Sequence, residues 1–180
     1  MDKPIELIPM LCVQCSTPVP AQEDEVAWVC AQCGQGLFLD EEKGLAPLEV
    51  QFAAGIPENK KGKPFWVAEG QVSLQRKSYG SSGRQSGEAQ RFWSQPRCFF
   101  VPAFECSLES LLSKGVELLI KPPDLQPGPG AAFEPVVLWH EDVSAAAEFI
   151  VMAVEAGRSD KVKEIDFSLQ LSTPVLWILP

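Results

Sequence analysis

Apolar residues recur at helical spacing in two stretches of the second half of the chain. The first stretch begins after Ser107, whose hydroxyl suits a helix N-cap, and it ends at Lys121, which two prolines follow. The second stretch runs from Asp142 to Gly157 and carries alanine, phenylalanine, isoleucine and valine on one face. We therefore predict one helix in each stretch.

Alternation of apolar and polar residues predicts strands on both sides of these helices. Residues 65–77 alternate in this way, and residues 78–90 after them have the glycine- and serine-rich composition of a flexible loop. Residues 91–104 are rich in aromatic side chains and contain two prolines, which favours extended chain. Residues 165–171 alternate again, and we expect them to form a hairpin with the apolar residues 174–180.

The order of these elements divides the chain into three parts. Residues 64–180 are expected to form an α+β domain with four or five mostly antiparallel strands and two helices. A cysteine-rich module occupies residues 1–44. Residues 45–63 combine a short alternating stretch with a glycine- and proline-containing turn, which is typical of a connector.

The composition is that of a globular protein rather than a disordered or membrane-spanning one. The chain has 180 residues, of which 46% are hydrophobic and 22% are charged, so it can form a packed core. No apolar run is long enough to cross a membrane, and the first residues lack the pattern of a signal peptide. We therefore expect a cytoplasmic protein without membrane insertion.

Charge is distributed unevenly along this acidic chain, whose formal net charge is −9. Residues 61–100 carry seven basic and two acidic side chains, and acidic segments flank them. The basic residues either face an anion or pair with the flanking acids, and their mixture with aromatic residues over 60–97 makes nucleic-acid binding an alternative function. The candidate contacts are Lys61, Lys63, Arg76, Lys77, Arg84 and Arg91.

Four cysteines near the start form two CxxC pairs, Cys12 with Cys15 and Cys30 with Cys33. Each CxxC turn can direct two sulfur atoms at one point, and two turns supply the tetrahedral four-sulfur set that suits Zn²⁺. A rubredoxin-type iron site uses the same ligands, usually with a longer gap between the pairs. A redox-active dithiol would instead need one CxxC at a strand-to-helix junction.

Residues 10–40 resemble the zinc-ribbon family and, more loosely, rubredoxin-like knuckles. Gly34 keeps the glycine of the second knuckle, whereas Ser16 stands where the first knuckle usually has glycine. The resemblance implies one structural Zn²⁺ and a zinc ribbon over residues 1–44. It implies no particular task, because zinc ribbons occur in transcription factors, ribosomal proteins, enzymes and scaffolds alike.

Outside the four paired cysteines, few residues suggest catalysis. His140 is the only histidine, and Cys98 and Cys106 have no activating base nearby in the sequence. The chain has no P-loop, GxGxxG, GxSxG or HExxH motif. Its five tryptophans, a residue type favoured at interfaces, lead us to expect a non-catalytic accessory or scaffold protein that docks on another protein.

Overall fold

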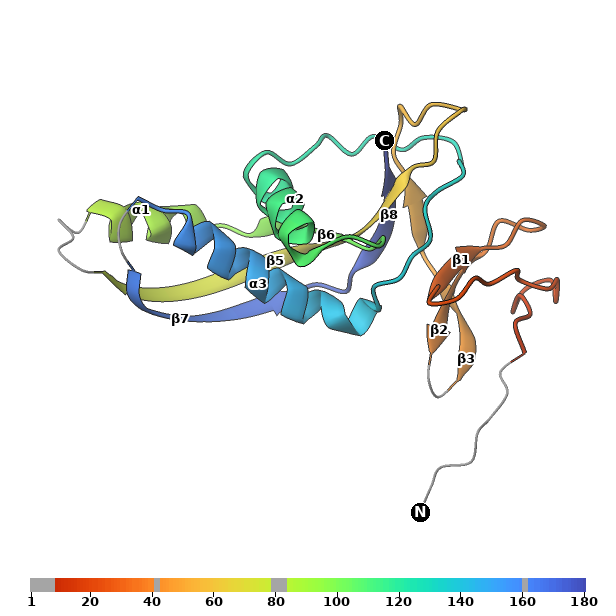
Figure 1. Cartoon of the computed structure of the whole chain (residues 1–180), viewed down its shortest axis with the longest axis horizontal. Helices are drawn as coiled ribbons and strands as arrows, with labels where there is room; N and C mark the ends of the chain where they lie inside the picture. Colours follow the sequence, from red (N-terminus) through yellow and green to blue (C-terminus); the bar gives the residue numbers. More distant parts are fainter. Residues whose placement is uncertain (1–8, 41–42, 79–83, 160–161) are drawn as a thin grey trace, which may run out of the picture.

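Two β-sheets lie next to each other in the computed structural model, which describes residues 9–40, 43–78, 84–159 and 162–180 (Figure 1). The smaller sheet has three strands and belongs to the cysteine-rich part. The larger sheet has five strands, and within the described residues three α-helices accompany it. The predicted α+β class with a mostly antiparallel sheet is confirmed, whereas the predicted number of two helices is wrong.

The small sheet is an antiparallel meander in the order β1-β2-β3. Its strands are β1 (Ala27–Val29), β2 (Gly36–Asp40) and β3 (Gly44–Leu48). β1 pairs with β2, because the second CxxC turn reverses the chain between them.

One long strand organises the large sheet and pairs with three others. The strands are β4 (Val50–Phe52), β5 (Lys63–Ser78), β6 (Arg97–Pro102), β7 (Val162–Leu171) and β8 (Val175–Leu179). β6 runs antiparallel along one edge of β5, and β7 and β8 run antiparallel along the other edge. β4 adds to β8 in parallel, so residues 45–63 contribute a strand to each sheet.

The predicted hairpin of β7 and β8 is wrong. Both strands pair with β5 in succession, with Gly70 opposite Leu171 and Val67 opposite Val175. At the break between them, the backbone N–H of Ser172 still donates to the Glu69 carbonyl at 2.8 Å. β5 has 16 residues, about 50 Å of extended chain, so one edge can hold both strands.

Three helices accompany the large sheet: α1 (Arg84–Trp93), α2 (Leu108–Ile120) and α3 (Val143–Ala156), the last preceded by a 3₁₀ turn at His140–Asp142. α2 and α3 are the two predicted helices. Ser107 caps α2 as expected, because its hydroxyl accepts a hydrogen bond from the Ser110 backbone N–H at 3.2 Å. No helix of the described part of the chain is long and apolar enough to span a membrane.

α1 replaces part of the predicted loop and the start of the predicted extended segment. Its residues Ala89 and Trp93 are buried against the rest of the domain, with exposed fractions of 0% and 2%. This burial outweighs the low helix propensity of the glycine- and serine-rich sequence. Residues 79–83 of the predicted loop lie outside the described residues.

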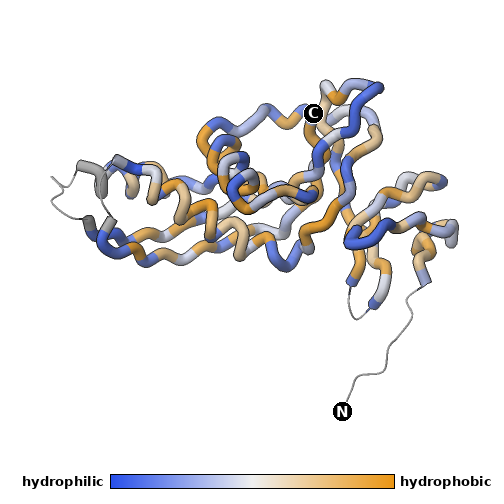
Figure 2. Tube along the Cα trace, viewed as in Figure 1, coloured by the Kyte–Doolittle hydropathy of each residue, from blue (hydrophilic) through white to orange (hydrophobic). Residues whose placement is uncertain are grey.

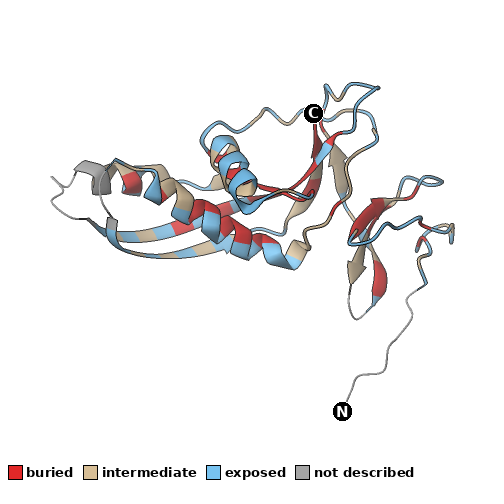
Figure 3. Cartoon of the chain, in the orientation of Figure 1, coloured by how far each residue is buried: buried red, intermediate tan, exposed pale blue. Residues whose placement is uncertain are grey.

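The large sheet buries apolar side chains on both faces near β6. Figure 3 marks the buried segments in red. Trp66 and Phe99 point into the main core, where they join Ile150 of α3. Their neighbours Phe65 and Phe100 point to the opposite face and a smaller core. Successive residues of a strand point to opposite faces, so this arrangement follows from the pleat.

The small sheet joins the domain through β1. The Val26 backbone N–H donates to the Val136 carbonyl at 2.8 Å, and Ala27 forms an isolated antiparallel bridge with Val136. Val26 and Ala27 are buried in the main core of the large sheet. This bridge therefore holds the small sheet against the rest of the domain.

Candidate metal centre

The two CxxC turns have the same backbone geometry. In the first turn, the Ser16 N–H donates to the Cys12 carbonyl at 2.8 Å, and the Cys12 N–H donates to the Thr17 carbonyl at 2.9 Å. The second turn repeats both bonds. The Gly34 N–H donates to the Cys30 carbonyl at 2.8 Å, and the Cys30 N–H donates to the Gln35 carbonyl at 2.9 Å. Each turn thus directs its two cysteines toward one point.

The residue after each CxxC adopts a left-handed conformation, with φ of 57° at Ser16 and 75° at Gly34. Glycine adopts this conformation without strain, whereas a residue with a Cβ atom is disfavoured there. Ser16 therefore occupies the knuckle position that the resemblance assigns to glycine, and it keeps the glycine conformation.

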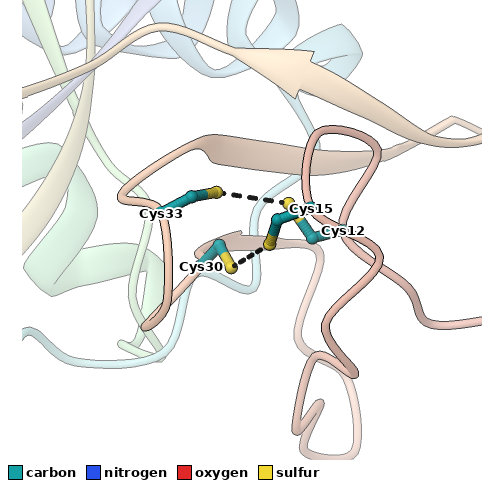
Figure 4. Close-up of side chains that lie close together, drawn as sticks. All are labelled: Cys12, Cys15, Cys30 and Cys33. Atoms are coloured by element: carbon teal, nitrogen blue, oxygen red, sulfur yellow. Dashed lines mark hydrogen bonds between the residues drawn. The ribbon is translucent and has the colours of Figure 1, made fainter.

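The four sulfur atoms converge on one point between the two turns (Figure 4). Cys12 Sγ lies 3.6 Å from Cys33 Sγ, and Cys15 Sγ lies 3.6 Å from Cys30 Sγ. All four sulfur atoms lie within 4.8 Å of one another. A tetrahedral Zn²⁺ with bonds of about 2.3 Å separates its sulfur ligands by about 3.8 Å, so the cluster has the size of a metal site.

The pKa values of two of the four thiols are shifted in opposite directions. Hydrogen bonds with the side chain and backbone of Thr17 lower the pKa of Cys15 to about 6. The Gln35 backbone N–H lowers the pKa of Cys33, but burial and the three neighbouring thiols outweigh it and raise that pKa to about 12. Four thiols at this distance resist full ionisation, and a bound cation removes that resistance.

The cysteine-rich part of the chain, here called the ribbon, has a small core that includes two of the four cysteines. Its buried residues are Cys12, Val19, Trp28, Cys30, Leu37 and Leu45. Cys12 and Cys30 are buried, while Cys15 and Cys33 lie nearer the surface. The indole N–H of Trp28 is buried and has no hydrogen-bond acceptor among the described residues.

A cleft of about 750 Å³ separates the ribbon from the large sheet beside the metal centre. Its walls include Pro18, Trp28, Phe52 and Phe133, and its lining within the described residues has two charged side chains, Glu25 and Lys61. The cleft lies beside residues 130–133, where the chain bonds to Gly62 before it reaches β1 at Val136. The Gly62 N–H donates to the Ala132 carbonyl, and the Glu134 N–H donates to the Gly62 carbonyl.

The basic candidate residues fall into two separate groups. Lys61 and Lys63 lie at the beginning of β5, whereas Arg76 and Lys77 lie near its end, about 40 Å further along the strand. Lys61 borders the cleft, and the Lys63 ammonium lies 5.0 Å from the centre of the Phe104 ring.

Ion pairs engage two members of the second group. Lys77 Nζ lies 2.8 Å from Glu164 Oε2, and this contact raises the pKa of Lys77 and lowers the pKa of Glu164. Arg76 is directed into the core. Arg84 is the first residue of α1, and the exposed Arg91 donates to the Gly87 carbonyl. Nucleic-acid binding through these residues stays a prediction, and their separation adds no support to it.

The sequence patterns missed one buried polar cluster centred on Glu155, which is 1% exposed. Glu155 Oε1 accepts hydrogen bonds from Trp93 Nε1 and Arg158 Nε, both at 2.8 Å. Arg76 Nε lies 3.2 Å from Glu155 Oε2, an ion pair without hydrogen-bond alignment. In the sequence, the only indication of this cluster was a glutamate on the apolar face of the second predicted helix. The cluster joins α1, α3 and β5.

The remaining reactive side chains do not form one site. His140 packs edge-on against Phe38, with ring centres 4.9 Å apart, and its Nε2 lies 3.9 Å from Glu141 Oε1. Cys98 and Cys106 pack on the smaller core across the sheet. Burial raises the pKa of both thiols; Glu69 adds to the increase at Cys98, and Lys63 partly offsets it at Cys106.

Comparisons with known proteins add no relative to this description. The chain matches no family model, and no curated protein or solved structure matches it. Function is therefore inferred from the cysteine cluster, the cleft and the surface of the domain.

Proposed function

We infer that this chain is a zinc-binding accessory protein that docks a segment of another protein beside its metal centre. The convergence of four cysteine sulfurs within 4.8 Å supports the metal. Thiolates favour Zn²⁺, and the tetrahedral four-sulfur set also fits iron. Four protein ligands leave no coordination position for a substrate, so the ion has a structural role.

Metal analysis of the purified chain tests the first half of this proposal. We expect about one zinc ion per chain. Cys33→Ser removes one ligand and should abolish stoichiometric zinc binding, whereas Cys106→Ser changes a thiol outside the cluster and should retain it. Iron in place of zinc, or equal loss of metal in both variants, would contradict the assignment.

The cleft beside the ribbon supports the second half. Its volume of about 750 Å³ falls within the range of roughly 300–1,000 Å³ that is typical of ligand pockets. β1 is an edge strand, and among the described residues its outer edge meets the chain only at the Ala27–Val136 bridge. An extended peptide can add to such an edge through its backbone.

The side chains of the cleft define the chemistry of the peptide. The aromatic walls at Phe52 and Phe133 suit a bulky apolar side chain. Trp28 also contributes to the lining of the cleft. Of the two charged residues in its lining, Lys61 attracts an acidic side chain and Glu25 attracts a basic one.

Selection from a random peptide library against the full zinc-loaded chain tests this docking site. We expect enriched peptides with a bulky apolar residue next to an acidic one. Lys61→Glu should weaken their binding about tenfold, because it reverses the charge at the rim. Lys60→Glu makes the same charge change at a neighbouring exposed position outside the cleft lining and should leave binding nearly unchanged.

Two results would refute the docking site. One is the absence of any enriched peptide, and the other is a set of peptides that both lysine variants bind equally well. Neither result affects the metal analysis, so the two halves of the proposal can fail separately.

A further inference from the structure

A second and smaller pocket, here called the junction pocket, lies where the small sheet meets the large one. Its volume is about 260 Å³, and its lining includes Phe38, Glu49, Trp66 and His140. Residues of β2 and β3 form one side of it, and residues of β5 and β8 and the turn before α3 form the other. Figure 2, in which apolar segments are orange, shows this junction. The junction pocket shares no lining residue with the cleft among the described residues, so it is a separate candidate site.

Three aromatic rings contribute to the walls of the junction pocket. The ring centres of Phe38 and His140 lie 4.9 Å apart at an angle of 72°, and those of Trp66 and His140 lie 6.3 Å apart at 52°. Rings at such angles face different directions instead of stacking flat on one another. Trp66 is 1% exposed and forms part of the inner wall, and its indole N–H is fixed by a hydrogen bond of 2.8 Å to the Leu138 carbonyl. The faces of aromatic rings are negative, so these walls attract a cation.

The charge of the junction pocket is negative. Glu49 is exposed in its lining and is the single residue between β3 and β4. Its Oε1 accepts a hydrogen bond from the neutral amide of Gln51 at 2.8 Å, and no ion pair among the described residues involves it. The Glu141 carboxylate lies 3.9 Å from His140 Nε2 and adds a second acid beside the rings. Within the described residues, the lining contains neither lysine nor arginine to balance these charges.

Size and polarity narrow the kind of cation that fits. The volume of about 260 Å³ is slightly below the range of roughly 300–1,000 Å³ that is typical of drug-sized ligands, so the junction pocket admits a group of a few atoms. A divalent metal ion requires several oxygen ligands, and the lining offers one carboxylate. A primary ammonium group is strongly hydrated, which disfavours contact with aromatic walls. A methylated ammonium group carries the charge under an apolar surface, and aromatic rings beside a carboxylate suit both properties.

We propose that the junction pocket binds a quaternary ammonium group, such as that of choline or of trimethyllysine. The rings of Phe38, Trp66 and His140 contact the methyl groups, and the Glu49 carboxylate attracts the positive charge. The dissociation constant for choline is expected to be roughly 1 mM, because so small a cation makes few contacts. Both sheets contribute to the walls, so a bound cation also stabilises the junction between them.

Titration of the full chain with choline, followed by NMR, tests this site. We would work at about pH 8, where a histidine side chain is ordinarily neutral and does not repel a cation. Choline should shift the backbone amide signals of Phe38 and Glu49 and the indole N–H signal of Trp66. Dimethylbutanol, the neutral isostere with carbon in place of nitrogen, should bind at least about fivefold more weakly, because it has the shape of choline without the charge.

Two pairs of variants separate the contributions of charge and ring. Glu49→Gln should weaken choline binding about fivefold and leave dimethylbutanol binding unchanged, whereas Glu109→Gln, at an exposed position on α2, should change neither. Phe38→Leu keeps an apolar side chain but removes the ring, and it should also weaken choline binding about fivefold. Phe133→Leu makes the same change in a wall of the cleft and should leave choline binding unchanged.

Equal binding of choline and dimethylbutanol would overturn the proposal, and so would the absence of shifts at the junction pocket at about ten times the expected dissociation constant. Should Phe38→Leu lose the native spectrum, the exposed Glu49→Gln decides the matter alone. Comparison of choline with a peptide that contains trimethyllysine identifies the natural source of the group, and tight binding of either supports the site. Failure here would leave the metal centre and the cleft unaffected, because they share no residue with the junction pocket within the described chain.

Discussion

The ribbon and the large sheet lie side by side but use different means of stabilisation. The ribbon has a core of six buried residues, two of which are candidate metal ligands. The main core of the large sheet has seventeen buried residues drawn from both sheets and from the helices. The larger core buries enough apolar surface to fold by itself, whereas a core of six residues is of the size that a metal cross-link commonly stabilises.

The ribbon and the large sheet are not independent units, because they share buried residues at their junction. Val26 and Ala27 belong to the ribbon by sequence, but they are buried in the main core of the large sheet. Their strand therefore has support that does not depend on the metal. We therefore expect the folding of the cysteine turns to depend strongly on the metal and the folding of β1 to depend on it less.

Removal of the metal should have the largest effect and should be confined to one side of the junction. Structural zinc contributes about 10–16 kcal/mol in zinc-finger peptides, so chelation should unfold the two cysteine turns. Hydrogen exchange should then show loss of protection in the two cysteine turns, a smaller loss in β1, and retained protection in β5 and β6. Loss of protection in β5 would break the comparison, because it would make the two sheets one cooperative unit.

Replacement of Glu155 should destabilise the large sheet and leave metal binding by the ribbon unchanged. Glu155→Gln leaves Arg76 and Arg158 without their carboxylate partner and should lower the free energy of unfolding by about 3–5 kcal/mol. Denaturant titration measures this loss, and zinc content should stay unchanged. Glu148→Gln removes an exposed carboxylate from the same helix and should shift stability by less than about 0.5 kcal/mol. Equal effects of the two variants would show that the buried cluster contributes little.

Exchange of the two knuckle residues should give the smallest effect, and the two changes should have opposite signs. Ser16→Gly relieves a left-handed φ of 57° and should stabilise the ribbon by about 1 kcal/mol. Gly34→Ser places a residue with a Cβ atom at a φ of 75° and should destabilise the ribbon by a similar amount. No atom lies within 4 Å of the added Cβ, so steric crowding adds nothing to this cost. Competition with a chelator measures both changes, because metal binding is coupled to folding of the ribbon. Effects of the same sign would contradict the equivalence of the two turns.

Local sequence patterns were sufficient for the features that depend on neighbouring residues. The CxxC spacing alone identified Cys12, Cys15, Cys30 and Cys33, and the structure places their sulfurs within 4.8 Å of one another. Ser107 was sufficient to locate the start of α2, because an N-cap acts on residues two or three positions ahead. Such features involve short loops, whose closure costs little entropy.

The remaining features required contacts between distant parts of the chain. α1 forms because Ala89 and Trp93 are buried by the rest of the fold, and its local composition alone predicts a loop. β7 and β8 pair with β5 because that strand is long enough to hold both, a property of its tertiary position. Arg76 belongs to a basic run in the sequence, but the fold sets it against Glu155, 79 positions further along the chain. The sequence by itself thus determined the four-cysteine cluster and the helix cap. The tertiary structure decided the pairing of strands and the partners of charges, because alternation specifies a strand's faces but not its neighbour.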